Sequence, residues 1–170
     1  PCAGLTDEEC FEQIIADEDS KRGDLSNAGI EVNKEPCDNF GAENCTHVGL
    51  LNTSTLAKLI EVKNDCVSTN QNCTIMVTGG TEYWLHSEGG SHRDFVAVDL
   101  RLTGADIFNQ FIRSKQSAGP SNYCNARFDY KGLRFCDEKG GDAHWHVAPA
   151  TSGGGSTSGG LIKFENIGKD

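Results

Sequence analysis

The sequence has no apolar run of the roughly twenty residues that a membrane-spanning helix requires, and it carries few positive charges. Its 15 Lys and Arg residues are outnumbered by 25 Asp and Glu residues, which gives a net charge of −10. Such a chain repels a polyanion, so we expect neither a membrane span nor a nucleic-acid partner. There is also no initiator Met before Pro1, which indicates that a targeting segment was removed or that the chain is a fragment.

The cysteines form an even set of eight, and none of them makes the CxxC pair that is typical of a structural zinc site. Eight cysteines allow 105 connectivities. Pairing between sequence neighbours would close four small loops, and we expect this pattern. The pairs are Cys2–Cys10, Cys37–Cys45, Cys66–Cys73 and Cys124–Cys136.

Four disulfides imply an oxidising compartment, so a secreted, extracellular or cell-surface location is expected. Three glycosylation sequons agree with this location, although one or two could arise by chance. They would place N-glycans at Asn44, Asn52 and Asn72 if the host glycosylates.

The length of 170 residues suits one domain with a sizeable core. We expect helices over 6–17, 53–64 and 103–115, with Thr6 and Glu9 as a capping box and Phe11, Ile14 and Ile15 on one face of the first. Covering loops are expected over 18–50. Strands are expected over 73–80, 95–101 and 143–148, with a hairpin over 126–136 that turns at Lys131-Gly132. This order predicts an α+β domain over residues 1–150, with a mostly antiparallel sheet flanked by helices and stapled by disulfides.

Three of the five histidines lie in two short stretches, SHRDFVAVD at 91–99 and DAHWHVAP at 142–149. On a strand, His144 and His146 point to the same face and Trp145 points to the other, where it is most simply a core residue. If the two strands are neighbours, His92, Asp99 and His146 converge as two nitrogen donors and one oxygen donor. That set is typical of a zinc ion with an open fourth position, at which a bound water can attack a carbonyl group.

The order of His92, Ala97 and Asp99, followed by His144-Trp145-His146, resembles the zinc D-alanyl-D-alanine peptidases. That superfamily includes bacterial cell-wall D,D-carboxypeptidases, Ala-Ala dipeptidases, murein endopeptidases and the hedgehog signalling domain. The resemblance spans roughly residues 54 to 149 by element order. It implies that His92, Asp99 and His146 are metal ligands and that His144 is a hydrogen-bonding or proton-handling group beside the metal.

The sequence departs from the family pattern at the proton-handling positions. The family glutamate three residues before the last metal histidine falls on Ala143, and the family arginine is absent from TGGTE, where Thr81 and Glu82 stand. Asp142 shares a strand face with His144 and is therefore the expected catalytic base. Glu82 or Glu88 are the alternatives.

The remaining aromatic and histidine residues have simpler interpretations. Tyr83 and Trp84 are either a platform for substrate or, more simply, side chains that pack over the domain. His86 is interpreted as a loop histidine, and His47 carries no functional signal.

Two functions are therefore predicted. The first is a secreted zinc hydrolase acting on small peptide or cell-wall peptide bonds. The second is an inactive extracellular structural or interaction subunit that retains the peptidase-like fold. The Gly/Ser-rich segment 151–160 and an expected strand at 161–170 bear on the second function, because that strand could dock on its own domain or on a neighbouring copy in a homo-oligomer or filament.

Overall fold

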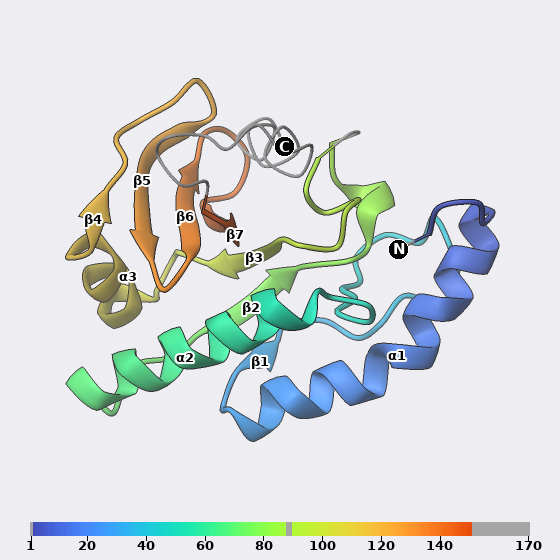
Figure 1. The fold of residues 1–170 in the computed structure, drawn as a ribbon, viewed down its shortest axis with the longest axis horizontal. Helices are drawn as coiled ribbons and strands as arrows, with labels where there is room; N and C mark the ends of the chain where they lie inside the picture. Colours follow the sequence, from blue (N-terminus) through green and yellow to red (C-terminus); the bar gives the residue numbers. More distant parts are fainter. Residues whose placement is uncertain (1, 88–89, 151–170) are drawn as a thin grey trace.

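The computed structural model describes residues 2–87 and 90–150, which form three α-helices, one short 3-10 helix and seven strands. Figure 1 shows how these elements are arranged. The helices are α1 (Asp7–Asn27), α2 (Thr53–Thr69) and α3 (Asp106–Arg113), and η1 (Tyr83–Leu85) is the 3-10 helix. The strands are β1 (Glu31–Val32), β2 (Met76–Gly79), β3 (Val98–Arg101), β4 (Gln116–Ser117), β5 (Cys124–Tyr130), β6 (Leu133–Glu138) and β7 (His144–Pro149).

All seven strands belong to one sheet in the order β1-β2-β3-β7-β6-β5-β4. Only β1 and β2 pair in parallel, and the other five pairings are antiparallel. The predicted α+β class with a mostly antiparallel sheet is therefore confirmed. The condition for convergence of the candidate ligands is also met, because β3 and β7 are neighbours and Asp99 lies opposite His146.

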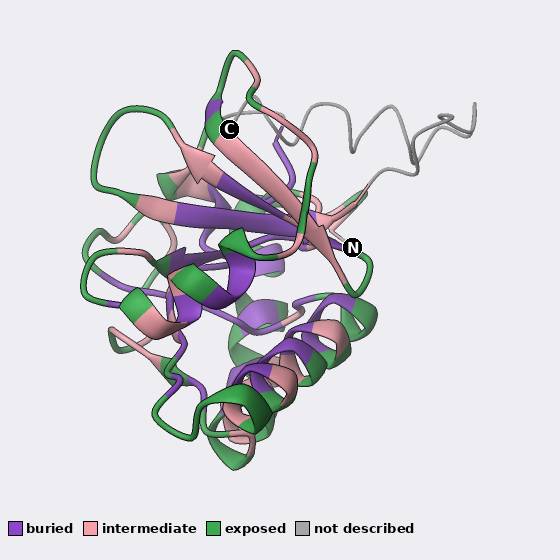
Figure 2. Cartoon of the chain, turned by 90° about the vertical axis from the view of Figure 1, so that its left-hand side faces the viewer, coloured by how far each residue is buried: buried purple, intermediate pink, exposed green. Residues whose placement is uncertain are grey.

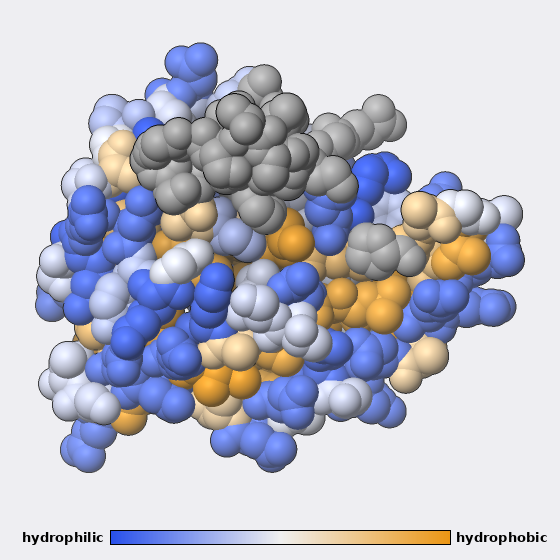
Figure 3. All heavy atoms as spheres, in the orientation of Figure 1, coloured by the Kyte–Doolittle hydropathy of each residue, from blue (hydrophilic) through white to orange (hydrophobic). Residues whose placement is uncertain are grey.

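The main core lies between the three helices and one face of the sheet (Figure 2). Leu100 and Trp145 are opposite one another in register and both are fully buried in this core, as predicted for Trp145. Because strand residues alternate, Asp99 and His146 must point to the other face. The fold thus separates an apolar face from a face that carries the candidate site. On the face that Figure 3 shows, hydrophilic side chains surround smaller areas of apolar side chains.

Helix α1 is longer than predicted, and residues 18–27 are helical rather than loop. The predicted capping box is present, since Thr6 and Glu9 each accept a hydrogen bond from the other's backbone N–H. Apolar periodicity did not predict this extension, because its buried positions include a charged residue, Glu18, as well as Leu25. Ile15 was expected to face the core with Phe11 and Ile14, but it is exposed.

Other boundaries also differ from the prediction. Strand β2 and helix α3 are shorter than expected, and the ends of β5, β6 and β7 differ by one or two residues. Helix α2 continues to Thr69 rather than ending near residue 64, which places Cys66 on its buried face. Strand β3 begins at Val98 rather than at Phe95, because Phe95 has a φ of 60° and closes a turn with a hydrogen bond from its N–H to the His92 carbonyl. This turn brings His92 back over the start of β3.

The predicted disulfides and the predicted turn between β5 and β6 are confirmed. All four disulfides join sequence neighbours as expected, and no cysteine is free among the described residues. The β5–β6 hairpin turns at Lys131 and Gly132, both of which have positive φ values as a tight two-residue turn requires.

Other expectations concern the surface and the end of the chain. None of the helices in the described ranges is long and apolar enough to cross a membrane. Asn44, Asn52 and Asn72 are all exposed, so each sequon is accessible, and glycosylation stays a prediction. The segments 151–160 and 161–170, with the strand expected there, lie outside the described residues, and so does Glu88, one of the two alternative bases.

Candidate metal centre

Three predicted ligands meet on the open face of the sheet. Asp99 comes from β3, His146 from β7, and His92 from the turn that precedes β3. Asp99 Oδ1 lies 3.2 Å from His92 Nε2 and 3.2 Å from His146 Nδ1. Ligand atoms bound at zinc distances in a tetrahedral arrangement are separated by roughly 3.3 Å, so each of these two contacts with Asp99 has the spacing of a pair of zinc ligands.

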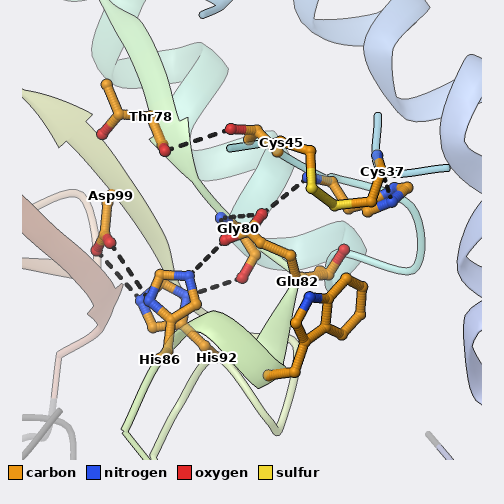
Figure 4. Close-up of polar contacts among 12 residues, drawn as sticks. Cys37, Cys45, Thr78, Gly80, Glu82, His86, His92 and Asp99 are labelled. Atoms are coloured by element: carbon orange, nitrogen blue, oxygen red, sulfur yellow. Dashed lines mark hydrogen bonds and ion pairs between the residues drawn. A yellow bond between two sulfur atoms is a disulfide. The ribbon is translucent and has the colours of Figure 1, made fainter. Parts of the chain in front are cut away.

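His86 also belongs to the site, although its sequence context indicated only a loop histidine. It follows η1 and its ring stacks on that of His92, with 3.5 Å between centroids and 9° between planes. Donor atoms of His86, His92 and Asp99 all lie within 4.8 Å of one another, so these three residues could hold a metal ion. Within the described ranges this group includes two of the three predicted ligands and has His86 in place of His146. Figure 4 shows both rings directed toward the Asp99 carboxylate. No sequence pattern identified this histidine, because its place depends on how the chain folds at η1.

In both His92 and His144, the ring nitrogen Nδ1 is hydrogen-bonded to a backbone carbonyl. His92 Nδ1–H donates to Gly80 O at 2.8 Å, and His144 Nδ1–H donates to Asp142 O at 2.8 Å. In a neutral ring this leaves the lone pair on Nε2. Nε2 of His92 faces Asp99 at 3.2 Å, and Nε2 of His144 lies 3.8 Å from the same oxygen.

His146 and His86 are oriented in the same manner by side chains. His146 Nε2 is hydrogen-bonded to Ser91 Oγ at 2.9 Å, and His86 Nε2 is hydrogen-bonded to the Glu82 carboxylate. Their Nδ1 atoms then face Asp99. Metal-binding histidines are usually held through the nitrogen that does not bind the metal, so the donor set and its outer contacts fit a divalent cation.

Gly79 leaves space for these side chains. It pairs with Asp99 across β2 and β3, and an added Cβ would lie 2.9 Å from Asp99 Oδ2 and 3.0 Å from His86 Cε1. Any larger residue would therefore fill the space in which the donors converge.

The charges of the site depend strongly on one another. Burial lowers the pKa of His92, but the Asp99 carboxylate outweighs burial and raises it. Burial alone would raise the pKa of Asp99, whereas His92 and His146 hold it well below its usual range. For His144, burial is outweighed by Glu138 and Asp99, which raise its pKa to about 9. Without a metal, this site therefore favours an ionised Asp99 beside protonated His92 and His144.

A cavity of about 230 Å³ opens over these side chains. Its lining includes four histidines and the carboxylates of Asp99 and Glu138. Glu138, from the end of β6, lies 3.5 Å from His144 Nε2 and 3.8 Å from His146 Nδ1. Asp142, the residue expected to be the base, is exposed, is not among the residues that line the cavity, and contacts His144 through its backbone carbonyl.

Tyr83 and Trp84 pack over the domain, which was the simpler of their two interpretations. Tyr83 is buried and donates to Asp7 Oδ1 at 2.6 Å, while Trp84 Nε1–H donates to Ala42 O at 2.8 Å and its ring contacts Phe40. Neither aromatic residue lines the cavity.

A second buried ionic cluster lies between α1 and the segment that follows β1. Glu18 accepts hydrogen bonds from His47 Nδ1 at 2.9 Å, from Arg22 Nε at 2.7 Å and from the backbone N–H groups of Val48 and Gly49. This cluster attaches the loop to the helix and explains why a glutamate is buried on α1.

Comparisons with known proteins identify no relative. No protein-family model matches the chain, and no curated protein or solved structure matches it.

Proposed function

We propose that this protein is an extracellular zinc hydrolase of the D-alanyl-D-alanine peptidase type that cleaves small peptide bonds, such as those of cell-wall peptides. The observation that carries the proposal is the convergence of His92 Nε2 and His146 Nδ1 on Asp99 Oδ1, each at 3.2 Å, at a cavity that also contains Glu138. The motif order, the mostly antiparallel α+β fold and the disulfides agree with it.

In this proposal His92, Asp99 and His146 hold the ion. Two imidazoles and one carboxylate leave a fourth position open, which is the arrangement of catalytic rather than structural zinc sites. When bound, zinc supplies Lewis acidity that polarises a carbonyl group and lowers the pKa of a water molecule to roughly 7.

Glu138 is the group best placed to accept and return a proton. Its carboxylate lines the cavity beside His144 and His146, whereas the side chain of Asp142 does not. His144 faces the cavity with Nε2 and donates hydrogen bonds there in its protonated form, so it stabilises negative charge on a reacting oxygen.

Metal analysis and turnover test the assignment together. We expect native protein to contain about one zinc per chain and to release D-Ala from a cell-wall peptide in a chelator-sensitive reaction, and we expect His146→Ala to lose the zinc. Glu138→Gln should keep the zinc and lose turnover by about 10²–10⁴-fold, as expected for a general base. Asp142→Asn is the matched control and should keep both properties. A zinc-loaded Glu138→Gln protein with full turnover contradicts this role.

The stacked His86 ring favours a second candidate function, an inactive structural or interaction subunit. If His86 joins the other three ligands, all four positions of zinc are filled and the site is closed, as in structural zinc sites. Stoichiometric zinc without turnover, lost as completely in His86→Ala as in His146→Ala, would identify this second function.

A further inference from the structure

Glu82 is a buried carboxylate that the proposed chemistry does not use. Its side chain is only 2% exposed, just after β2 and next to the metal centre. Burial of an ionised carboxylate is costly unless hydrogen bonds compensate for the lost water. Glu82 Oε1 accepts from His47 N at 2.8 Å and from Gly80 N at 3.0 Å, while Oε2 accepts from Gly80 N at 2.9 Å and is hydrogen-bonded to His86 Nε2.

These contacts link Glu82 to two histidines of the centre (Figure 4). The first link is direct, because the bond to Nε2 leaves His86 Nδ1 facing Asp99 Oδ2 at 3.7 Å. The second passes through Gly80, whose N–H binds Glu82 and whose carbonyl accepts the Nδ1–H of His92 at 2.8 Å. One carboxylate therefore orients both stacked rings.

We infer that Glu82 is a positioning residue that holds the proton of neutral His86 on Nε2 and keeps the lone pair of Nδ1 directed into the cavity. With Gly80, it also sets the position of the carbonyl that orients His92. The inference deepens the proposed function by adding His86 to the groups that face the ion. It rests on the proposed metal centre only for the expected effect on zinc affinity, which follows if His86 binds the ion together with His92 and Asp99. The position of the His86 proton can be tested without any metal.

The variant Glu82→Gln distinguishes a Glu82 that orients the His86 ring from a Glu82 that only fills space in the core. The amide oxygen takes the place of Oε1, where two backbone N–H groups, from His47 and Gly80, require an acceptor. The amide NH2 group then faces His86 and can only donate, so His86 Nε2 must accept. The proton of the neutral ring moves to Nδ1, which can no longer bind a metal.

A matched control exists in the neighbouring cluster. Glu18 is also a buried carboxylate and binds the ring of His47, but it lines no part of the cavity. Glu18→Gln therefore weakens the loop attachment and lowers stability, and it leaves the His86 tautomer and the zinc affinity at the wild-type values.

The experiment is nitrogen NMR of the histidine side chains in metal-free protein at alkaline pH, where an ordinary imidazole is neutral. Each variant is also titrated with zinc in competition with a chelating dye. We expect wild-type His86 to carry its proton on Nε2, and Glu82→Gln to carry it on Nδ1 and to bind zinc about 10–100-fold more weakly.

Two results would overturn the inference. One is a proton on Nδ1 of His86 in the wild-type protein, a measurement that requires no variant to fold. The other is a folded Glu82→Gln protein with the wild-type tautomer and zinc affinity. Absence of zinc binding by the wild-type protein refutes the proposed function instead, and the tautomer still decides the role of Glu82.

Discussion

Replacement of Gly79 by Ala is a direct test of whether Asp99 and His86 form the metal centre. The backbone φ of Gly79 is not positive, so alanine can adopt it without strain. The new Cβ would lie 2.9 Å from Asp99 Oδ2, 3.0 Å from His86 Cε1 and 3.3 Å from Asp99 Cβ. Ordinary contacts with carbon require about 3.5 Å, so the two side chains must move by about 0.5 Å.

This displacement equals the tolerance within which a functional constellation must be held. We therefore expect Gly79→Ala to weaken zinc binding by about 10–100-fold, the cost typical of disturbing the contacts that orient metal ligands. This corresponds to about 1.4–2.7 kcal/mol of binding free energy. The stability of the metal-free protein should fall by no more than about 2.6 kcal/mol. Crowding costs about 1–3 kcal/mol, and the lower conformational entropy of the unfolded chain with alanine offsets about 0.4–1 kcal/mol of this cost.

Zinc affinity by dye competition and denaturant unfolding with and without zinc measure the two effects separately. Because a ligand stabilises a protein by RT ln(1 + [L]/Kd), the zinc-dependent part of the stability should drop by the same 1.4–2.7 kcal/mol, approximately. Gly23→Ala in α1 is the control, since a Cβ there meets no atom within 4 Å. Wild-type zinc affinity in Gly79→Ala would refute the placement of the ion beside Asp99 and His86.

Three further predictions concern stability. Gly23→Ala should raise the unfolding free energy by about 0.5–1 kcal/mol in urea titration, because alanine is the better helix former. Burial raises the pKa of Glu18, but hydrogen bonds from His47 and other donors outweigh burial and lower it, so its contribution is present above the unfolded value of 4.5 and is lost as the pH falls through the lower folded value. Unfolding free energies measured below pH 4.5 should therefore decline less steeply in Glu18→Gln than in the wild-type protein. Replacing Cys124 and Cys136 together by Ser should cost about 3 kcal/mol in the same titration, because their bridge spans 12 residues.

The features that the sequence predicted correctly are those determined by a few neighbouring residues. The Thr6–Glu9 capping box, the Lys131-Gly132 turn and the disulfides between neighbouring cysteines all depend on short separations along the chain. The extent of α1 depends instead on a contact between Glu18 and His47, which are 29 residues apart. A charged residue on the buried face of a helix breaks the apolar periodicity, so its partner must be known before the helix can be recognised.

In the candidate site, too, some residues could be predicted from the sequence and others could not. His92, Asp99 and His146 could be selected because strand alternation and a motif resemblance place them on one face. His86 could not be selected, because its stacking on His92 depends on η1, which lies between Glu82 and His86 and lets the Glu82 carboxylate bind His86 Nε2.

The carboxylate that we propose to handle protons, Glu138, lies at a position that an offset along one strand would not select. Asp142 shares the alternation of His144 and His146, yet it precedes β7 and its side chain does not line the cavity. The carboxylate beside His144 belongs to the next strand, because Asp137 pairs with Trp145 and the following residue, Glu138, comes to lie next to His144. Strand register is set by long-range pairing of β6 with β7 and not by spacing within either strand. A base supplied across the sheet can therefore occupy the same space as one supplied along the strand, while its sequence position carries no trace of the family motif.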